Sequence, residues 1–164
     1  MDHTETQLWV LGHRVRMLHT DGDYALLEVV TDPGTPGPPL HHHEDGAEFF
    51  YVVDGALELI ADGQPRLLQR GESFSVPRGV VHTFSNPTDR PVTVLTGFSP
   101  RAFEGWFKEC GVPCDQPNAR EASVSPAALA RAGREASKFG MVLAAPAPAE
   151  PAQNAGQVVS LGVV

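Results

Sequence analysis

PPLHHHEDGAEFFYVVDG, residues 38–55, combines three adjacent histidines, an Asp-Gly pair and an alternating apolar run. His41 and His43 are two residues apart, so on a β-strand they project from the same face, and His42 projects from the other. The pair Asp45-Gly46 predicts a tight turn, because both residues tolerate positive φ. Glu48 opens the next strand, and a hairpin here brings its carboxylate back beside the two imidazoles.

A second segment, GESFSVPRGVVHTFSN at residues 71–86, supplies one more histidine. Its Pro77–Gly79 turn leads into a strand that begins near His82. If both segments lie in one barrel, three imidazoles and one carboxylate converge inside it. The other histidines, His3, His13 and His19, show no partner pattern and are interpreted as structural.

The chain around these segments has the character of an antiparallel β-protein. Asp-Gly pairs recur at residues 21–22, 45–46, 54–55 and 62–63, and short runs rich in Val, Leu, Phe and Thr lie between about residues 8 and 98. Such close spacing of strands and turns indicates a β-sandwich or barrel. We assign residues 1–98 to one β-barrel domain.

The pattern changes after residue 98. Ser99-Pro100 and Ser125-Pro126 each predict a helix that begins with a serine N-cap and a proline at the first helical position. Phe103, Trp106, Phe107 and Cys110 form an apolar stripe at helical spacing, which we expect to pack on the barrel. We therefore expect two C-terminal helices within residues 99–143, and a flexible Ala/Pro-rich tail over residues 144–164.

The composition argues against several classes of function. The net charge of −8 disfavours nucleic acid and anionic membranes, because both require a concentrated basic surface. The first ten residues, MDHTETQLWV, lack the basic and apolar regions of a secretory signal, and no apolar run approaches the roughly 20 residues that span a bilayer. We expect a soluble, cytoplasmic protein in which Cys110 and Cys114 are free thiols.

The two segments resemble the two motifs of the cupin superfamily. The first motif, Gly-x5-His-x-His-x3–4-Glu-x6-Gly, is matched by His41, His43, Glu48 and Gly55. Its leading glycine departs from the pattern, because Gly37 lies too near His41 and Gly34 too far. The second motif, Gly-x5-Pro-x-Gly-x2-His-x3-Asn, is matched in full by Gly71, Pro77, Gly79, His82 and Asn86.

This resemblance implies an all-β fold, a single jelly-roll barrel of six to eight strands that pairs as a homodimer. It also implies that His41, His43, Glu48 and His82 bind one divalent transition metal ion (Fe, Mn, Ni, Co, Cu or Zn). Three neutral ligands and one carboxylate leave a local charge of about +1, which attracts an anionic oxygen. The segment after the barrel is similar to the helix that follows the barrel in bacterial quercetin dioxygenase-like cupins.

Strand parity also predicts the substrate pocket. With Glu48 and His82 pointing inward, Phe50, Val52 and Phe84 point inward too, and we expect them to line an apolar pocket for a planar small molecule. The first hypothesis is a metal-dependent dioxygenase of an enol-bearing aromatic such as a flavonol, with Glu48 as the catalytic base. The alternatives are a non-oxidative metal-dependent isomerase, cyclase or dehydratase, and a small-molecule-binding protein without turnover.

Overall fold

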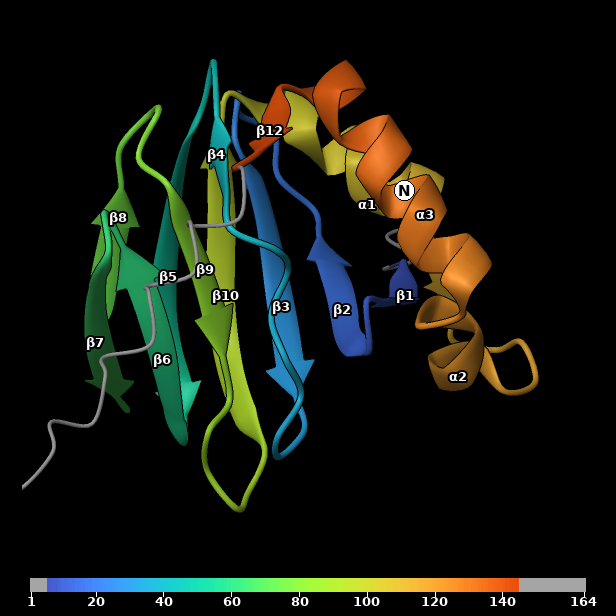
Figure 1. The fold of residues 1–164 in the computed structure, drawn as a ribbon, viewed down its shortest axis with the longest axis horizontal. Helices are drawn as coiled ribbons and strands as arrows, with labels where there is room; N and C mark the ends of the chain where they lie inside the picture. Colours follow the sequence, from blue (N-terminus) through green and yellow to red (C-terminus); the bar gives the residue numbers. More distant parts are fainter. Residues whose placement is uncertain (1–5, 145–164) are drawn as a thin grey trace, which may run out of the picture.

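The computed structural model describes residues 6–144, which form two antiparallel β-sheets and a group of helices (Figure 1). The seven-stranded sheet has the order β11 (Val112–Pro113), β1 (Gln7–Val10), β2 (His13–Leu18), β3 (Ala25–Thr31), β10 (Val92–Ser99), β5 (Ala47–Asp54) and β8 (Ser73–Val76). The five-stranded sheet has the order β12 (Met141–Leu143), β4 (His41–His43), β9 (His82–Ser85), β6 (Ala56–Ala61) and β7 (Gln64–Gln69).

The core lies between these two sheets. Along β5 the side chains alternate as predicted: Phe50 and Val52 are buried, whereas Phe49, Tyr51 and Val53 are exposed. Completely buried leucines and valines from both sheets pack against this inner row. Alternation with period two therefore defines which face of each strand is internal, and it places Glu48 on the internal face of β5.

The four Asp-Gly pairs all lie between strands, but they make two kinds of connection. Asp21-Gly22 and Asp62-Gly63 close true hairpins, β2–β3 and β6–β7. Asp45-Gly46 joins β4 to β5, and Asp54-Gly55 joins β5 to β6, and each of these pairs of strands belongs to different sheets. The prediction that a β4–β5 hairpin carries Glu48 back to the histidines was therefore wrong in detail, because the chain turns a corner there and changes sheet.

The segment after β10 contains more structure than two helices. A 3₁₀ turn, Arg101–Phe103, leads into α1 (Glu104–Cys110), followed by the short α2 (Ala119–Ser123), α3 (Pro126–Ala136) and a second 3₁₀ turn, Ser137–Phe139. Ser125 caps α3 as predicted, since its hydroxyl accepts from the backbone N–H of Ala128 at 3.2 Å. At the first boundary the 3₁₀ turn precedes the helix, so the predicted serine cap at Ser99 does not form.

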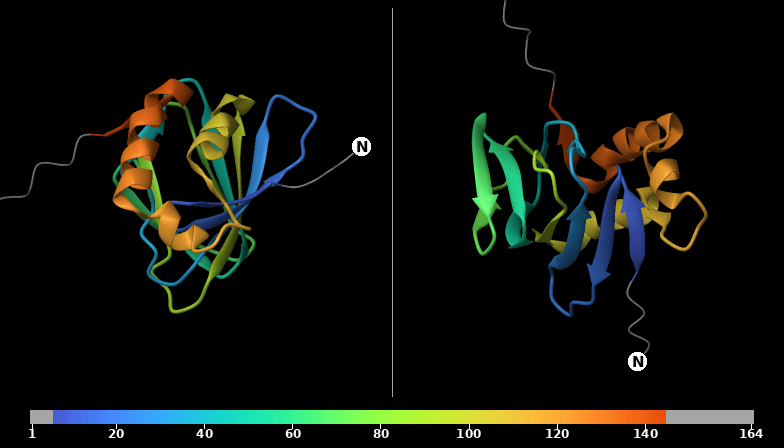
Figure 2. Two further views of the ribbon diagram at one scale, coloured as in Figure 1. Left: turned by 90° about the vertical axis from the view of Figure 1, so that its right-hand side faces the viewer. Right: turned by 90° about the horizontal axis from the view of Figure 1, so that it is seen from below.

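Helices α1, α2 and α3 gather at the β1 side of the molecule, away from β6 and β7 (Figures 1 and 2). The predicted stripe is buried: Phe103, Trp106, Phe107 and Cys110 all belong to the core. The Trp106 indole N–H donates to the carbonyl oxygen of Ala132 at 3.1 Å and so ties α1 to α3. Both cysteines are free, as expected.

Two short C-terminal strands extend the sheets beyond the six to eight strands that the resemblance implies. β11 pairs with β1, and β12 pairs with β4, so residues after 98 cover one edge of each sheet. β1 is paired on both sides within the chain, with β2 and with β11. The homodimer itself remains a prediction.

No helix within residues 6–144 is both long and apolar enough to cross a bilayer. The tail predicted for residues 144–164 lies outside the described residues, except for Ala144.

Candidate metal centre

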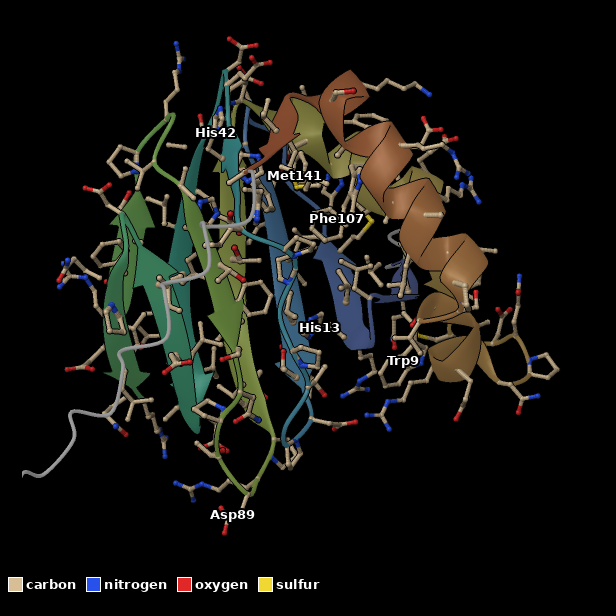
Figure 3. The ribbon with its side chains drawn as sticks, in the orientation of Figure 1. Trp9, His13, His42, Asp89, Phe107 and Met141 are labelled. Carbon is tan, nitrogen blue, oxygen red and sulfur yellow. The ribbon has the colours of Figure 1, made fainter. Side chains whose placement is uncertain are left out.

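The four predicted ligands reach one point from three strands of two sheets. His41 and His43 occupy alternate positions of β4, and the pairing of β4 with β9 sets His41 directly opposite His82. Glu48 comes from β5, in the other sheet. His42 is half-buried and does not belong to the cluster, as strand parity predicts; Figure 3 labels it on β4.

The donor atoms of the cluster are close enough to share one cation. Glu48 Oε2 lies 2.9 Å from Nε2 of His82 and 3.2 Å from Nε2 of His43. One donor atom from each of the four residues lies within 4.8 Å of the others. Two ligand atoms that each lie about 2.1 Å from a metal ion, at right angles to one another, are about 3.0 Å apart. The distances of 2.9 and 3.2 Å from Glu48 Oε2 to the two imidazole nitrogens match this separation.

Backbone carbonyls fix the orientation of two of the imidazoles. Nδ1 of His41 donates to the carbonyl oxygen of Pro39 at 2.8 Å, and Nδ1 of His82 donates to that of Val80 at 2.9 Å. A carbonyl oxygen only accepts, so each Nδ1 carries the proton, and in the neutral ring Nε2 has the free lone pair. This is the arrangement that metal-binding histidines commonly show.

The protonation states of His41 and Glu48 suit cation binding at neutral pH, whereas His82 holds a proton more tightly than an ordinary imidazole, and a cation has to displace that proton. Burial and the nearby His82 lower the pKa of His41 to about 4, so this imidazole is neutral. Burial acts to raise the pKa of Glu48, but hydrogen bonds and charge from His43 and His82 outweigh it and lower that pKa to about 2. Burial likewise acts to lower the pKa of His82, but the Glu48 carboxylate outweighs it and raises the pKa.

The site is thus a carboxylate, 5% exposed, surrounded by three imidazoles that are 0–6% exposed. A buried carboxylate requires a cationic partner, and none of the described residues that line the adjoining cavity is Arg or Lys. These donors fit a divalent transition metal ion, and three imidazoles with one carboxylate suit Fe, Mn, Co, Ni, Cu or Zn.

Thr96 is a residue of the site that the sequence analysis missed. It lies on β10, and its hydroxyl is 3.0 Å from Glu48 Oε1 and 2.9 Å from the carbonyl oxygen of Phe49. Its single proton is shared between these two acceptors, so it holds Glu48 Oε1 in place while Oε2 faces the imidazoles. A lone threonine in a strand gives no sequence signal for this role, because the contact depends on the register of β5 against β10.

Asn86, the last residue of the second motif, is structural. Its side-chain amide donates to the carbonyl oxygens of Thr31 and Arg90 at 2.9 and 2.8 Å, and its Oδ1 accepts from the backbone N–H of Thr88 at 3.0 Å. This buried amide ties the end of β9 to β3 and to the loop before β10.

A cavity of about 50 Å³ opens onto the cluster through His41 and Glu48. Its walls come from β1 to β5, β9, β10, β12, α1 and the turns beside them, and they are largely apolar: Val10, Leu11, His13, Val15, Val29, Pro38, His41, Glu48, Phe84, Thr96, Phe98, Phe103, Trp106, Phe107 and Met141. Figure 3 labels three of these lining residues, Met141, Phe107 and His13, from top to bottom of the view.

Only one of the three predicted pocket residues lines this cavity. Phe84 does, whereas Phe50 and Val52 point inward but lie in the packed core behind it. Phe50 packs against Phe84 with the rings tilted at 57° and their centroids 5.6 Å apart, so it supports the wall and does not form it. Instead, the wall is completed by α1, whose aromatic stripe was expected only to fill the core, and by His13, which was interpreted as structural.

The chain has the cupin fold, in which two antiparallel sheets face each other, and here they enclose a three-histidine, one-glutamate cluster. Residues 27–98 match the family described as "Cupin domain".

The similar proteins include two whose names state different reactions and one whose name states none. Quercetin 2,3-dioxygenase from Bacillus subtilis is 33% identical over 98 residues, which are 58% of this chain and 28% of that protein. KdgF from Halomonas sp. is 28% identical with a TM-score of 0.55, and the match covers 62% of this chain and 91% of that one. A cupin-superfamily sugar phosphate isomerase from Silicibacter pomeroyi is 28% identical with a TM-score of 0.50, over 54% and 59% of the two chains.

The matches to curated relatives cover 15% to 45% of those proteins' length. The chain therefore spans less than half the length of these curated relatives.

Proposed function

We propose that this protein is a metal-dependent dioxygenase of a small enolisable carbonyl compound, bound in the apolar cavity beside Glu48. The observation that carries the proposal is the cavity itself. It reaches the His/Glu cluster, and its lining includes no Arg or Lys among the described residues. Such a wall suits an organic molecule with few polar groups, and it lacks the cationic partner that a sugar phosphate would need.

The size of the cavity restricts the substrate. An apolar cavity of about 150 Å³ is known to hold benzene, and this one measures about 50 Å³. A flavonol, with three rings, is too large for it unless the aromatic wall residues move. A β-diketone is no smaller than benzene, so it too requires the wall residues to move, or a route through the larger cavity of about 200 Å³ beside His43. It requires much less movement than a flavonol, and we therefore narrow the expected substrate to a compact enol of this kind.

Glu48 is the one carboxylate among the described lining residues, and it is the candidate acceptor for the acidic proton of the substrate. A divalent ion at the site supplies Lewis acidity, which lowers the pKa of a hydroxyl group that reaches it. Thr96 holds Glu48 Oε1, so the carboxylate keeps one orientation while it takes the proton. The side chains of Phe98, Phe103 and Trp106 exclude bulk water from the enolate.

Dioxygenation of the enolate incorporates both atoms of O₂ into the product. The carbon–carbon bond beside the enolate carbon breaks, and the substrate carbons are oxidised by the four electrons that O₂ accepts. The similarity to quercetin 2,3-dioxygenase, a dioxygenase by name, supports this reaction.

A non-oxidative reaction is the second candidate, because the similarity to a sugar phosphate isomerase is of comparable identity. In that case Glu48 returns the proton to a different atom of the same enolate, and no O₂ is consumed. The apolar wall favours the first candidate, since it offers few partners for the hydroxyl groups of a sugar.

The test begins with elemental analysis of the purified protein, followed by loading with each of the six candidate metals. Pentane-2,4-dione and quercetin are then incubated with each form in air and under nitrogen, and O₂ uptake and products are measured. We expect O₂-dependent consumption of the diketone that is lost in His82→Ala. The matched control is His42→Ala, on the same strand as two ligands but outside the cluster, and it keeps the activity.

Turnover of the substrate under nitrogen would refute the dioxygenase proposal and support the isomerase or cyclase proposal. Binding of the diketone without any product, for every metal, would leave a binding protein and refute both enzymatic proposals.

A further inference from the structure

His13 lies at the end of the cavity away from β12. It is the first residue of β2, it is 4% exposed, and it lines the cavity together with the two metal-cluster residues His41 and Glu48. Met141 of β12 pairs with His43, so it marks the cluster end. In Figure 3 Met141, Phe107 and His13 follow one another in that order.

The His13 ring is held in one orientation. Nδ1 lies 3.0 Å from the hydroxyl oxygen of Thr31, and the carbonyl oxygen of the same threonine accepts from Asn86. Phe84 packs on the ring with centroids 5.2 Å apart. The imidazole is therefore fixed by its neighbours before any ligand arrives.

The other ring nitrogen, Nε2, is buried and makes no hydrogen bond of normal length and angle, although the carbonyl group of Pro36 lies near enough to the ring to raise its pKa. Most buried polar atoms in proteins are paired, so an unpaired one requires an explanation. A structural water there would need two to four polar partners. The other polar groups of the cavity wall are engaged: His41 and Glu48 in the cluster, and Thr96 with Glu48.

We propose that His13 Nε2 is a positioning group for the substrate and binds a hydroxyl or carbonyl oxygen at the end of the molecule remote from the metal. This inference rests on the proposed function, because it takes the metal cluster as the anchor for the other end. The substrate class is thereby narrowed to compact molecules with two oxygen functions, one acidic and one neutral, joined by an apolar segment.

The substrate oxygen that binds His13 is expected to be neutral, for an electrostatic reason. Burial keeps the His13 ring uncharged, and none of the described lining residues is Arg or Lys. A carboxylate or phosphate at this end would be buried without a cationic partner. A neutral imidazole donates or accepts through Nε2 according to its tautomer, so it binds either a carbonyl or a hydroxyl group.

The test uses the Zn(II)-loaded protein and matched hydroxamic acids as probes. Hydroxamates bind metals through oxygen, and zinc performs no redox chemistry. The probes are the ω-hydroxy hydroxamic acids of four and five carbons, each compared with the isostere that carries a methyl group in place of the terminal hydroxyl. Dissociation constants are measured for the wild type, His13→Phe and His13→Gln, and the ¹⁵N resonance of His13 Nε2 is followed in the wild type.

In the wild type we expect one of the hydroxy probes to bind about fivefold to tenfold more tightly than its methyl isostere, the effect of one net hydrogen bond, and to shift the Nε2 resonance. In His13→Phe this preference disappears while the affinity for the methyl probe is retained. Because the NMR measurement needs no variant, it decides the question even if His13→Phe does not fold.

Equal affinities for both probes in the wild type, with an unchanged Nε2 resonance, would overturn the role of His13 and leave the metal-anchored cavity intact. Failure of all the hydroxamates to bind would overturn the metal-anchored cavity itself, and this inference with it.

Discussion

Lowering the pH from 7 to 5 should destabilise the wild-type protein more than a His13→Gln variant. Burial lowers the pKa of His13 from its ordinary 6.5 to about 4, outweighing the Pro36 carbonyl and Asp32, which raise it. In the unfolded chain His13 binds a proton below pH 6.5, whereas in the folded protein it remains neutral until about pH 4. Folding stability is therefore lost as the pH falls through this window, and the loss is complete below it.

The magnitude follows from the two pKa values. A tenfold difference in proton affinity corresponds to about 1.36 kcal/mol, so neutral burial of His13 costs about 3 kcal/mol at pH 4 and below, of which about 2 kcal/mol has been lost by pH 5. Glutamine does not titrate and retains a polar group. The wild type should thus lose about 2 kcal/mol more than His13→Gln between pH 7 and pH 5.

Urea unfolding, followed by the fluorescence of Trp9 and Trp106, measures this difference. A chelator is present throughout, so that metal binding does not contribute. With a denaturant slope of about 2 kcal/mol per molar, the excess loss corresponds to a midpoint shift of about 1 M urea. His19→Gln, at a histidine whose side chain is 60% exposed, is the control and should follow the wild type. If the wild type and His13→Gln lose the same stability, His13 is not buried as a neutral group and the reasoning fails.

Three further predictions concern packing, the support of Glu48 and the metal. Gly37→Ala would place a Cβ atom 1.5 Å from the carbonyl oxygen of Phe84, so thermal unfolding should show a loss of about 1–3 kcal/mol or more. Gly133→Ala lies in helix α3, where the added Cβ would make only an ordinary contact with Leu143 at 3.9 Å, and it should gain up to about 1 kcal/mol. Thr96→Val removes the donor to Glu48 Oε1 and should weaken Co(II) binding about 10- to 100-fold, while Thr96→Ser restores it; equal affinities would exclude this role. Zinc at about 100 times its dissociation constant should stabilise the folded protein by about 2.7 kcal/mol and raise its melting temperature. A chelator should reverse this rise. If neither zinc nor the chelator changes the melting temperature, the four residues do not form a metal centre.

Much of the candidate site was predictable because strand periodicity is local. Two histidines two residues apart must share a face of any strand they occupy, and the same parity sends His42 away from them. The spacing of the second segment added His82. The four side chains do converge, and the cupin fold inferred from the motifs is confirmed.

What the sequence could not supply are the contacts between elements that are distant along the chain. Nothing local distinguishes a hairpin from a corner at an Asp-Gly pair, so the sheet to which β5 belongs was assigned wrongly. Thr96 reaches Glu48 only through the register of β5 and β10. Phe50 and Phe84 have the same inward parity, yet only Phe84 faces the cavity, because the depth of a side chain in the barrel depends on what packs above it.

His13 shows most clearly the difference between what local sequence patterns predict and what contacts between distant residues decide. By itself it is one histidine at the start of a strand, and no pattern in the sequence singles it out. Only the folded chain brings it, through Thr31 and Phe84, to the same cavity as His41 and Glu48 and leaves one nitrogen unpaired. The sequence by itself indicated the barrel strands, their inner faces and the four residues of the candidate metal cluster, because alternation along a strand and the spacing within two short motifs are local features. The tertiary structure alone decided the shape of the cavity and its remote polar group, because they depend on contacts between residues tens of positions apart.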